Sequence, residues 1–311
     1  MNITSKILIT GSNGLVGTAL KKRLKLNGYK KLHFSNRQNC NLLSFKNTYD
    51  YIKRIKPDYI FHLANLVRGI GGNKSQEFNM LNDNLLINSN IFKAVSLVKI
   101  KKFILAGSAA GYSDRYKVNI KESNFTKGEP HLTEREYGYS KRIMLRQAKL
   151  LNKDTKIKYC YAILNNIYGA NDYFNEKEGH VIPSLIYRCF QSQIQNKDFL
   201  VWGSPNAKRC FLNSVDAADI LIKLAKQNKY NIVNVSSFKE YKISEVAEII
   251  KNCFNSKQKI KWIDKNISYV KKRSLNTDRL KDLNINEKIS LKAGLQQTVN
   301  WFLKNYPNIR K

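Results

Sequence analysis

A tyrosine and a lysine stand four residues apart, at Tyr137 and Lys141. On a helix predicted from about 137 to 151, this spacing puts both side chains on one face, where they can meet the same carbonyl group. A phenol, with a reference pKa of ~10, is a poor proton donor at neutral pH, and a nearby ammonium group lowers that pKa. Ser108, just beyond a strand predicted over 102–106, can donate a hydrogen bond to the reacting oxygen. The three residues together predict a site that reduces a carbonyl group.

The Tyr/Lys pair alone is weak evidence, because the chain has 17 tyrosines. Tyr139 is the internal competitor, but it has no lysine four residues further on. The order along the chain is more informative than the pair. A glycine turn, a serine at a strand end and the Tyr/Lys helix follow one another at the positions that a single fold requires.

The glycine turn lies at 11–17, between a strand predicted over 6–10 and a helix over 15–26. Gly11 permits a tight turn, Gly14 lets backbone amides approach a pyrophosphate, and Gly17 permits close helix packing. The amino end of the helix favours the negative charge. The turn therefore predicts dinucleotide binding, with contacts from Gly11, Ser12, Asn13, Gly14, Leu15, Val16 and Gly17.

The end of the second predicted strand decides which dinucleotide is expected. Sites that prefer NAD carry a carboxylate there for the ribose hydroxyls, whereas residues 33–37 of this chain contain none. Arg37 can pair instead with a 2′-phosphate. NADPH is therefore the predicted cofactor, and the alternative is that Arg37 is one more surface base on a basic protein.

Strands and helices are predicted to alternate through the first half of the chain. This alternation indicates an α/β fold with a Rossmann-type, doubly wound parallel sheet. The predicted strands cover 6–10, 31–34, 59–64, 102–106 and 158–164, and the predicted helices cover 15–26, 48–55, 81–98 and 137–151. We expect 1–170 to form an NADP-binding domain, to which 210–237 returns. A smaller C-terminal substrate-binding lobe should comprise 171–209 and 238–311, over the carboxyl ends of the strands.

Composition adds weaker constraints. The net charge of +32 by itself favours phosphate-bearing partners, but a lysine-rich and asparagine-rich solvated surface is the preferred explanation. Basic runs such as 21–23 lack interleaved aromatic residues, so nucleic acid is not the expected partner. No signal peptide and no apolar run of ~18 residues is seen, so we expect a cytoplasmic protein away from the membrane. Neither a metal site nor a disulfide framework is expected from the spacing of Cys40, Cys160, Cys189, Cys210 and Cys253.

Further along the chain, several stretches resemble those of the extended short-chain dehydrogenases/reductases, and within them the GDP-L-fucose synthases. The resemblance covers nearly the whole chain, and several of the stretches are typical of the subfamily rather than of the fold. They are 41–43, 69–73, 84–90, 166–169, 180–183, 201–204 and 209–212.

The resemblance implies a role for each matching position. Ser108, Tyr137 and Lys141 match the reductase triad, with His180 beside them. Asp216 matches an acidic position, for which ligand binding and helix capping both stay open. A homodimer through the Tyr/Lys helix and its neighbour is also implied. Implied NADP contacts are the glycine turn, Arg37, Lys141, Leu164, Asn166, Ile167 and His180, and implied GDP-sugar contacts are Arg188, Trp202, Arg209 and Arg273.

One position departs from this pattern. GDP-L-fucose synthases have a cysteine two residues after the active-site serine, which works with the histidine that matches His180 to epimerise the sugar. Here that position is Ala110, and a methyl group cannot abstract a proton. The expected activity is therefore NADPH-dependent C4 reduction of a GDP-4-keto sugar, a 6-deoxyhexose or a heptose, without C3/C5 epimerisation, for surface polysaccharide synthesis.

Four alternatives stay open: a bifunctional epimerase/reductase, an epimerase that retains NAD, a nucleic-acid-binding protein and a dinucleotide-sensing protein. A 4,6-dehydratase is disfavoured because no Asp-Glu pair follows Ser108. His33, His62 and His131 are interpreted as structural or surface residues.

Overall fold

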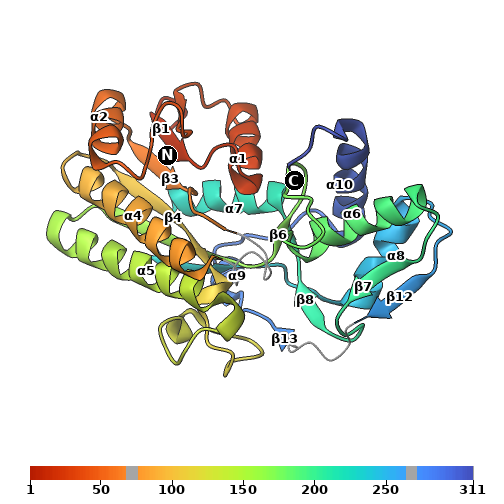
Figure 1. Ribbon diagram of the computed structural model, residues 1–311. Coiled ribbons are helices and arrows are strands. Elements are labelled where there is room, and N and C mark those ends of the chain that lie inside the picture. Colours follow the sequence, from red (N-terminus) through yellow and green to blue (C-terminus); the bar gives the residue numbers. More distant parts are fainter. Residues whose placement is uncertain (68–75, 264–271, 311) are drawn as a thin grey trace.

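A six-stranded parallel sheet forms the centre of the protein, in a computed structural model that describes residues 1–67, 76–263 and 272–310. The strand order is β10-β5-β4-β3-β1-β2 (Figure 1). The strands are short apolar runs, as expected where helices cover both faces of a sheet. They are β1 (Ile7–Thr10), β2 (Leu32–Phe34), β3 (Tyr59–His62), β4 (Lys102–Ser108), β5 (Lys158–Leu164) and β10 (Ile232–Val235). The predicted doubly wound parallel sheet is confirmed.

Helices cover the two faces of this sheet and bury one apolar cluster each (Figure 1). One face carries α2 (Phe45–Ile55), α4 (Glu77–Ser96) and α5 (Arg135–Thr155). The other carries α1 (Leu15–Leu26) and α7 (Ser214–Lys226). Each helix packs the apolar stripe of its sequence against the sheet. Because all six strands are parallel, their carboxyl ends lie at one edge.

A third apolar cluster lies beside the sheet, on the right in Figure 1. It is built from α6 (Val181–Ile194), β7 (Phe199–Trp202), α8 (Ile243–Cys253), β12 (Ile260–Ile263) and α10 (Leu291–Asn305). Phe302 is buried at its centre and contacts several other rings. The proposed domain boundaries stay a prediction, and Leu280 and Ile285 from the predicted lobe pack in the α1/α7 cluster.

Short strands and turns connect the two parts. A three-stranded sheet has the order β11-β8-β13, and β6 pairs with β9. The bounds are β6 (Ile167–Tyr168), β8 (Lys208–Cys210), β9 (Leu212–Asn213), β11 (Glu240–Lys242), β13 (Lys272–Arg273), α9 (Asp278–Asp282), and the 3-10 turns η1 (Ala109–Gly111), η2 (Glu122–Asn124) and η3 (Leu132–Glu134).

Element ends differ from the prediction where tertiary contacts set them. Strand β4 continues to Ser108, two residues further than predicted, because Gly107 and Ser108 pair with Ile163 and Leu164 of β5. Helix α2 begins at Phe45, because the Ser44 side chain accepts a hydrogen bond from the Asn47 backbone N–H. The extension of β4 puts Ser108 on the sheet itself.

His62 is an interior residue, as the sequence suggested. Its Nδ1 lies 2.8 Å from Thr10 Oγ1, and its Nε2 lies 3.0 Å from Asn88 Oδ1. Burial lowers the pKa of His62 to about 4. The neutral imidazole thus ties β1, β3 and α4 together. Within the described ranges, no helix is long and apolar enough to cross a membrane.

Candidate active site

The glycine turn after β1 is closely packed on the loop that follows β3. Gly11 has φ +65°, and a Cβ there would lie 2.7 Å from the backbone of Leu63 and Ala64. A Cβ on Gly17 would overlap the carbonyl oxygen of Gly11, so α1 starts directly against its own turn. Only glycine fits these two positions. The amino end of α1 therefore lies directly at the turn and, in the described part of the chain, carries no side-chain cap, so an anion can bind there.

Arg37 stands at the tip of the turn that follows β2. The Asn36 side chain accepts hydrogen bonds from the N–H groups of Gln38 and Asn39, which shapes this turn and leaves Arg37 exposed. Ser12 of the glycine turn donates to the Ser35 carbonyl at 3.2 Å. The basic tip and the glycine turn therefore lie at one edge of the sheet.

Three asparagines of α4 hold strand β3 and the loops around this edge. Asn84 Oδ1 accepts from the Leu66 N–H at 2.8 Å, and its Nδ2 donates to the Leu66 carbonyl at 2.9 Å. Asn88 binds His62, and Asn90 donates to the Leu42 carbonyl at 2.9 Å. The sequence pointed to this stretch only through the resemblance. The matching stretch 69–73 lies outside the described residues.

The structure brings Ser108, Tyr137 and Lys141 together. Ser108 ends β4, Tyr137 lies in the first turn of α5, and a hydrogen bond joins their side chains. Lys141 is 1 % exposed, and its Nζ donates to the Ala106 carbonyl at 2.7 Å. The same Nζ lies 5.3 Å from the centre of the Tyr137 ring. A phenol, a hydroxyl and an amine thus share one site.

The electrostatics of this cluster differ from the sequence-based expectation. Burial raises the pKa of Tyr137, and the hydrogen bond from Ser108 offsets only part of this rise. Burial also lowers the pKa of Lys141 to about 7. Lys141 is therefore not a permanent ammonium that lowers the phenol pKa. The reason is desolvation, which penalises the charged form of both groups.

Gly138, which follows Tyr137, permits the close approach of α5 to the turn after Ser108. A Cβ on Gly138 would lie 2.5 Å from the Ala110 carbonyl oxygen and 2.9 Å from Pro130 Cβ. Ala110 itself is buried in η1. Sequence reasoning passed over Gly138, because a glycine inside a helix carries no sign of what it touches.

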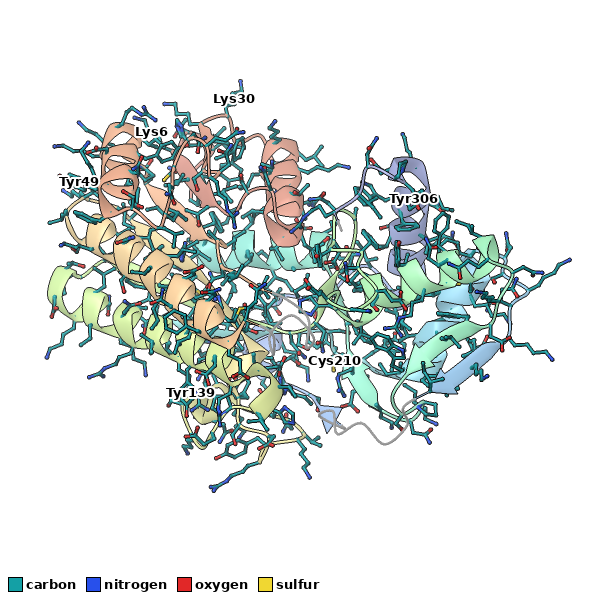
Figure 2. All side chains as sticks on the ribbon, viewed as in Figure 1. Lys6, Lys30, Tyr49, Tyr139, Cys210 and Tyr306 are labelled. Carbon is teal, nitrogen blue, oxygen red and sulfur yellow. The ribbon has the colours of Figure 1, made fainter. Side chains whose placement is uncertain are left out.

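Tyr139, the competitor of Tyr137, makes a different contact. Its hydroxyl donates to the Glu129 carboxylate, outside the cluster (Figure 2). Tyr139 is therefore separated from Ser108 and Lys141, as its lack of a matching lysine suggested.

Two arginines, Arg209 and Arg273, are register partners on the neighbouring strands β8 and β13. Arg273 Nη1 lies 2.9 Å from the Glu134 carboxylate, just before α5. This pairing lowers the pKa of Glu134 although burial opposes it. Among the residues that the structure describes, Arg273 Nε and Nη2 are buried without a hydrogen-bond partner. Such buried donors normally face a ligand or water.

Arg188 and Trp202 form a second pair. The Arg188 guanidinium stacks on the Trp202 ring at 3.5 Å from the ring centre, and it donates to Ser184 Oγ at 2.9 Å. The Trp202 ring is therefore held by a cation–π contact, and it is only half-buried beside the apolar cluster.

The remaining predicted cofactor contacts lie at the start of α6 and around the carboxyl end of β5. His180 is exposed at the start of α6 and lies within electrostatic reach of Glu134 and of Asp172. Burial raises the pKa of Asp172 to about 6. Leu164 ends β5, Ile167 begins β6, and Asn166 lies between the two strands.

Asp216 is a structural anchor. Its carboxylate accepts hydrogen bonds from the N–H groups of Lys288 at 3.1 Å and of Ile289 at 2.9 Å. These hydrogen bonds join α7 to the loop before α10, and Asp216 also lies in the first turn of α7, where an acidic side chain suits the helix dipole.

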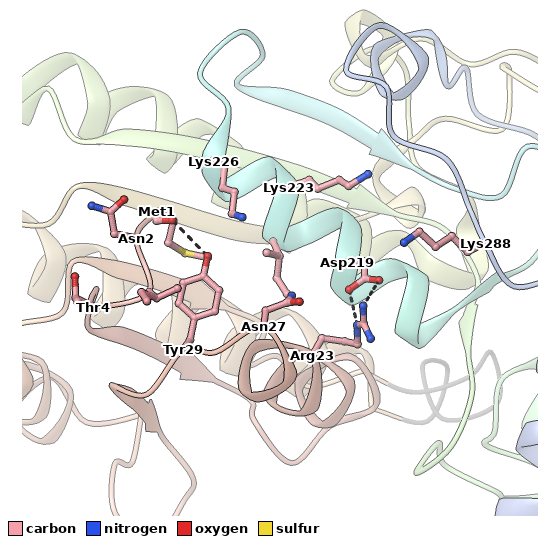
Figure 3. A pocket seen from close by; sticks show the side chains of 12 residues that line it. Met1, Asn2, Thr4, Arg23, Asn27, Tyr29, Asp219, Lys223, Lys226 and Lys288 are labelled. Carbon is pink, nitrogen blue, oxygen red and sulfur yellow. Dashed lines mark hydrogen bonds and ion pairs between the residues drawn. The ribbon is translucent and has the colours of Figure 1, made fainter.

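A basic hollow of 760 Å³ lies elsewhere, between the N-terminal segment, α1 and α7 (Figure 3). Lys223, Lys226 and Lys288 line it, and its carboxylate, Asp219, is held by Arg23. None of the three clustered residues reaches this hollow. The chemistry of the chain therefore points to the edge of the sheet and not to this depression.

Comparison with known proteins identifies the family of this chain. The NAD dependent epimerase/dehydratase family matches residues 7–236. The chain belongs to this family. The match spans the glycine turn, the Tyr/Lys helix and β10, which is the whole parallel sheet.

Individual proteins of the family are similar over nearly the full chain. The GDP-L-fucose synthase of Escherichia coli K12 is 28% identical over 316 residues, which are 98% of each chain. The crystal structure of a GDP-L-fucose synthetase from Naegleria fowleri bound to NADP is 28% identical with a TM-score of 0.92, and it covers 100% of this chain and 96% of that one. A GDP-mannoheptose C4 reductase from Campylobacter jejuni with NADP bound is 25% identical with a TM-score of 0.86, covering 97% and 99%.

Proposed function

We propose that the protein is an NADPH-dependent nucleotide-sugar reductase that reduces the C4 keto group of a GDP-4-keto sugar. The observation that carries this proposal is the cluster of Ser108, Tyr137 and Lys141 at the same carboxyl edge of the parallel sheet as the glycine turn. The similar proteins named above act on GDP-sugars or bind NADP, which supports both the cofactor and the substrate class.

The residues at the sheet edge fit the cofactor. The turn at Gly11 and Gly17 has no room for side chains and presents the amino end of α1 to the pyrophosphate. Arg37, exposed and without a neighbouring carboxylate in 33–37, suits a 2′-phosphate. Leu164, Asn166, Ile167 and His180 complete the proposed contacts. Bound NADPH supplies the hydride.

The clustered residues supply the proton and hold the oxygen. Ser108 donates a hydrogen bond to the C4 oxygen, and Tyr137 gives its phenolic proton to the alkoxide as charge develops there. The raised phenol pKa keeps Tyr137 protonated near neutral pH, so its proton is available when the alkoxide forms. Lys141, with a pKa of about 7, can pass a proton to Tyr137 near neutral pH.

The GDP part of the substrate is proposed to bind to two pairs of side chains. Arg209 and Arg273 suit the pyrophosphate, because the free Nε and Nη2 donors of Arg273 form one edge of a guanidinium fork. The Arg188/Trp202 stack suits the base. Ala110 offers no base for C3 or C5, so reduction proceeds without epimerisation, and His180 serves as a substrate hydrogen-bonder or proton donor.

The first test compares Tyr137→Phe with Tyr139→Phe. NADPH oxidation is followed with GDP-4-keto-6-deoxymannose, in D2O, and deuterium is measured at C3 and C5 of the product. We expect Tyr137→Phe to lose turnover while it binds NADPH normally, and Tyr139→Phe to stay active. Full activity of Tyr137→Phe would refute the proposed role, and deuterium uptake by the wild type would replace reduction alone with the bifunctional reaction.

The proposed homodimer would use α4 and α5. Leu86 of α4 is 44% exposed, and Ile143 and Leu150, seven residues apart on α5, are 40% and 42% exposed. Apolar side chains at this spacing form a stripe that a second copy can cover. The mass in solution by light scattering tests it, and a monomer would reject this assembly.

A further inference from the structure

The segment between β4 and α5 leaves the sheet next to the proposed active site and returns to it. It departs after Ser108, and it comes back through η3 into the helix that carries Tyr137. Its two arms meet at a neck, where Ser113 forms an antiparallel bridge with Pro130. The position of Ser108 relative to Tyr137 therefore depends on how this neck is held against α5.

Arg142 fastens the neck to α5. Its Nε donates to the Gly111 carbonyl at 2.7 Å, its Nη1 to the Gly128 carbonyl at 2.6 Å and its Nη2 to the Lys127 carbonyl at 3.2 Å. Gly111 belongs to the outgoing arm, and Lys127 and Gly128 to the returning arm. One guanidinium thus closes both arms of the neck, which its planar set of five N–H donors allows and a lysine ammonium would do less well.

The contact that Arg142 secures is a close one. One turn earlier on α5, Gly138 lies against the Ala110 carbonyl with no room for a Cβ. The Ala110 N–H in turn donates to Ser108 Oγ at 3.2 Å. Gly138 permits the approach of the turn to the helix, and the three hydrogen bonds of Arg142 provide the attraction that maintains it. Ser108 is the first residue to move if that turn lifts.

We propose that Arg142 is a positioning residue for the reaction, which holds η1 against α5 so that Ser108 and Tyr137 stay within hydrogen-bond distance. The inference rests on the proposed function, and it adds a residue that touches neither cofactor nor substrate. A side chain that acts through geometry should affect kcat far more than cofactor binding.

The test compares Arg142→Met with Lys149→Met in the full-length protein. Lys149 lies seven residues further along the same helix and is exposed, outside the stripe of Ile143 and Leu150, so it controls for the loss of one charge on α5. We expect Arg142→Met to lower kcat at least about tenfold, because a displacement of ~1 Å can cost ~100-fold. The Kd of NADPH should stay within about twofold, and Lys149→Met should match the wild type. Equal kcat for the two variants would overturn the proposal.

A double-mutant cycle with Ser108→Ala separates positioning from general stabilisation. If Arg142 acts through Ser108, Arg142→Met adds less than about twofold in the Ser108→Ala background. If the two losses multiply in full, Arg142 acts independently of Ser108 and the inference is wrong. Should Arg142→Met fail to fold, Arg142→Lys, which keeps the charge but loses the fork, takes its place in the same cycle.

The failure of this inference differs from the failure of the proposed function. Full activity of Ser108→Ala together with Tyr137→Phe would reject the proposed reaction itself. Loss of activity in those two variants, with normal kcat in Arg142→Met, would leave the reaction intact and reject only the role of Arg142.

Discussion

Replacing Gly138 by alanine tests whether the active site depends on the close contact between α5 and η1. The added Cβ would lie 2.5 Å from the Ala110 carbonyl oxygen, whereas non-bonded heavy atoms prefer about 3.5 Å. Helix and turn must therefore separate by about 1 Å. A hydrogen bond of ordinary length between Ser108 and Tyr137 does not survive such a shift.

Two opposing effects decide the stability of Gly138→Ala. Alanine gains about 1 kcal/mol over glycine inside a helix. Overpacking against a backbone carbonyl costs about 1 to 3 kcal/mol, and a carbonyl cannot swing away as a side-chain end would. We expect a net loss of free energy of unfolding of up to about 2 kcal/mol, and a fall in kcat of about 10- to 100-fold.

The assays are urea unfolding, steady-state NADPH oxidation and NADPH binding by fluorescence. The cofactor Kd should change little, because the glycine turn lies on other elements. A variant that is more stable than the wild type and keeps kcat within about twofold would show that the contact is looser than described. The dependence of Ser108 on Gly138 would then be refuted.

The remaining predictions concern single sites. Because burial lowers the pKa of His62 to about 4, the unfolded chain takes up a proton that the folded protein refuses as pH falls from about 6.5 to 4. The free energy of unfolding should fall by up to about 3 kcal/mol over that window, and it should fall much less in His62→Gln. Chemical denaturation of both proteins at several pH values measures the difference. Trp202→Ala, which removes the stack on Arg188, should raise KM for the GDP-sugar at least about tenfold with the NADPH Kd unchanged; equal KM would remove Trp202 from the substrate site. Ala110→Cys should bring deuterium from solvent into the product, as measured by mass spectrometry. A product without deuterium would mean that the cysteine is not the only group missing for epimerisation.

Local sequence was sufficient for the parts of the site whose geometry is local. The turn at 11–17 was predicted because three glycines between a strand and a helix have few other uses, and the structure gives Gly11 a positive φ. Tyr137 and Lys141 were predicted to share a face because the helix fixes the relation between residues four apart. The alternation of strands and helices likewise predicted the parallel sheet, because apolar residues recur along the sequence with the different spacings of strands and helices.

Only the tertiary structure decided the contacts between distant segments and the charges within them. Glu134 meets Arg273, which lies 139 residues further along the chain, and nothing near either residue indicates that contact. In the sequence Arg142 is one of 55 basic residues, and only the fold shows that it donates hydrogen bonds to the carbonyl groups of the neck. Lys141 was expected to carry a steady charge, and burial by distant elements lowers its pKa to about 7. Hydrogen bonding across loops and desolvation depend on what packs around a group, which spacing along the chain does not encode.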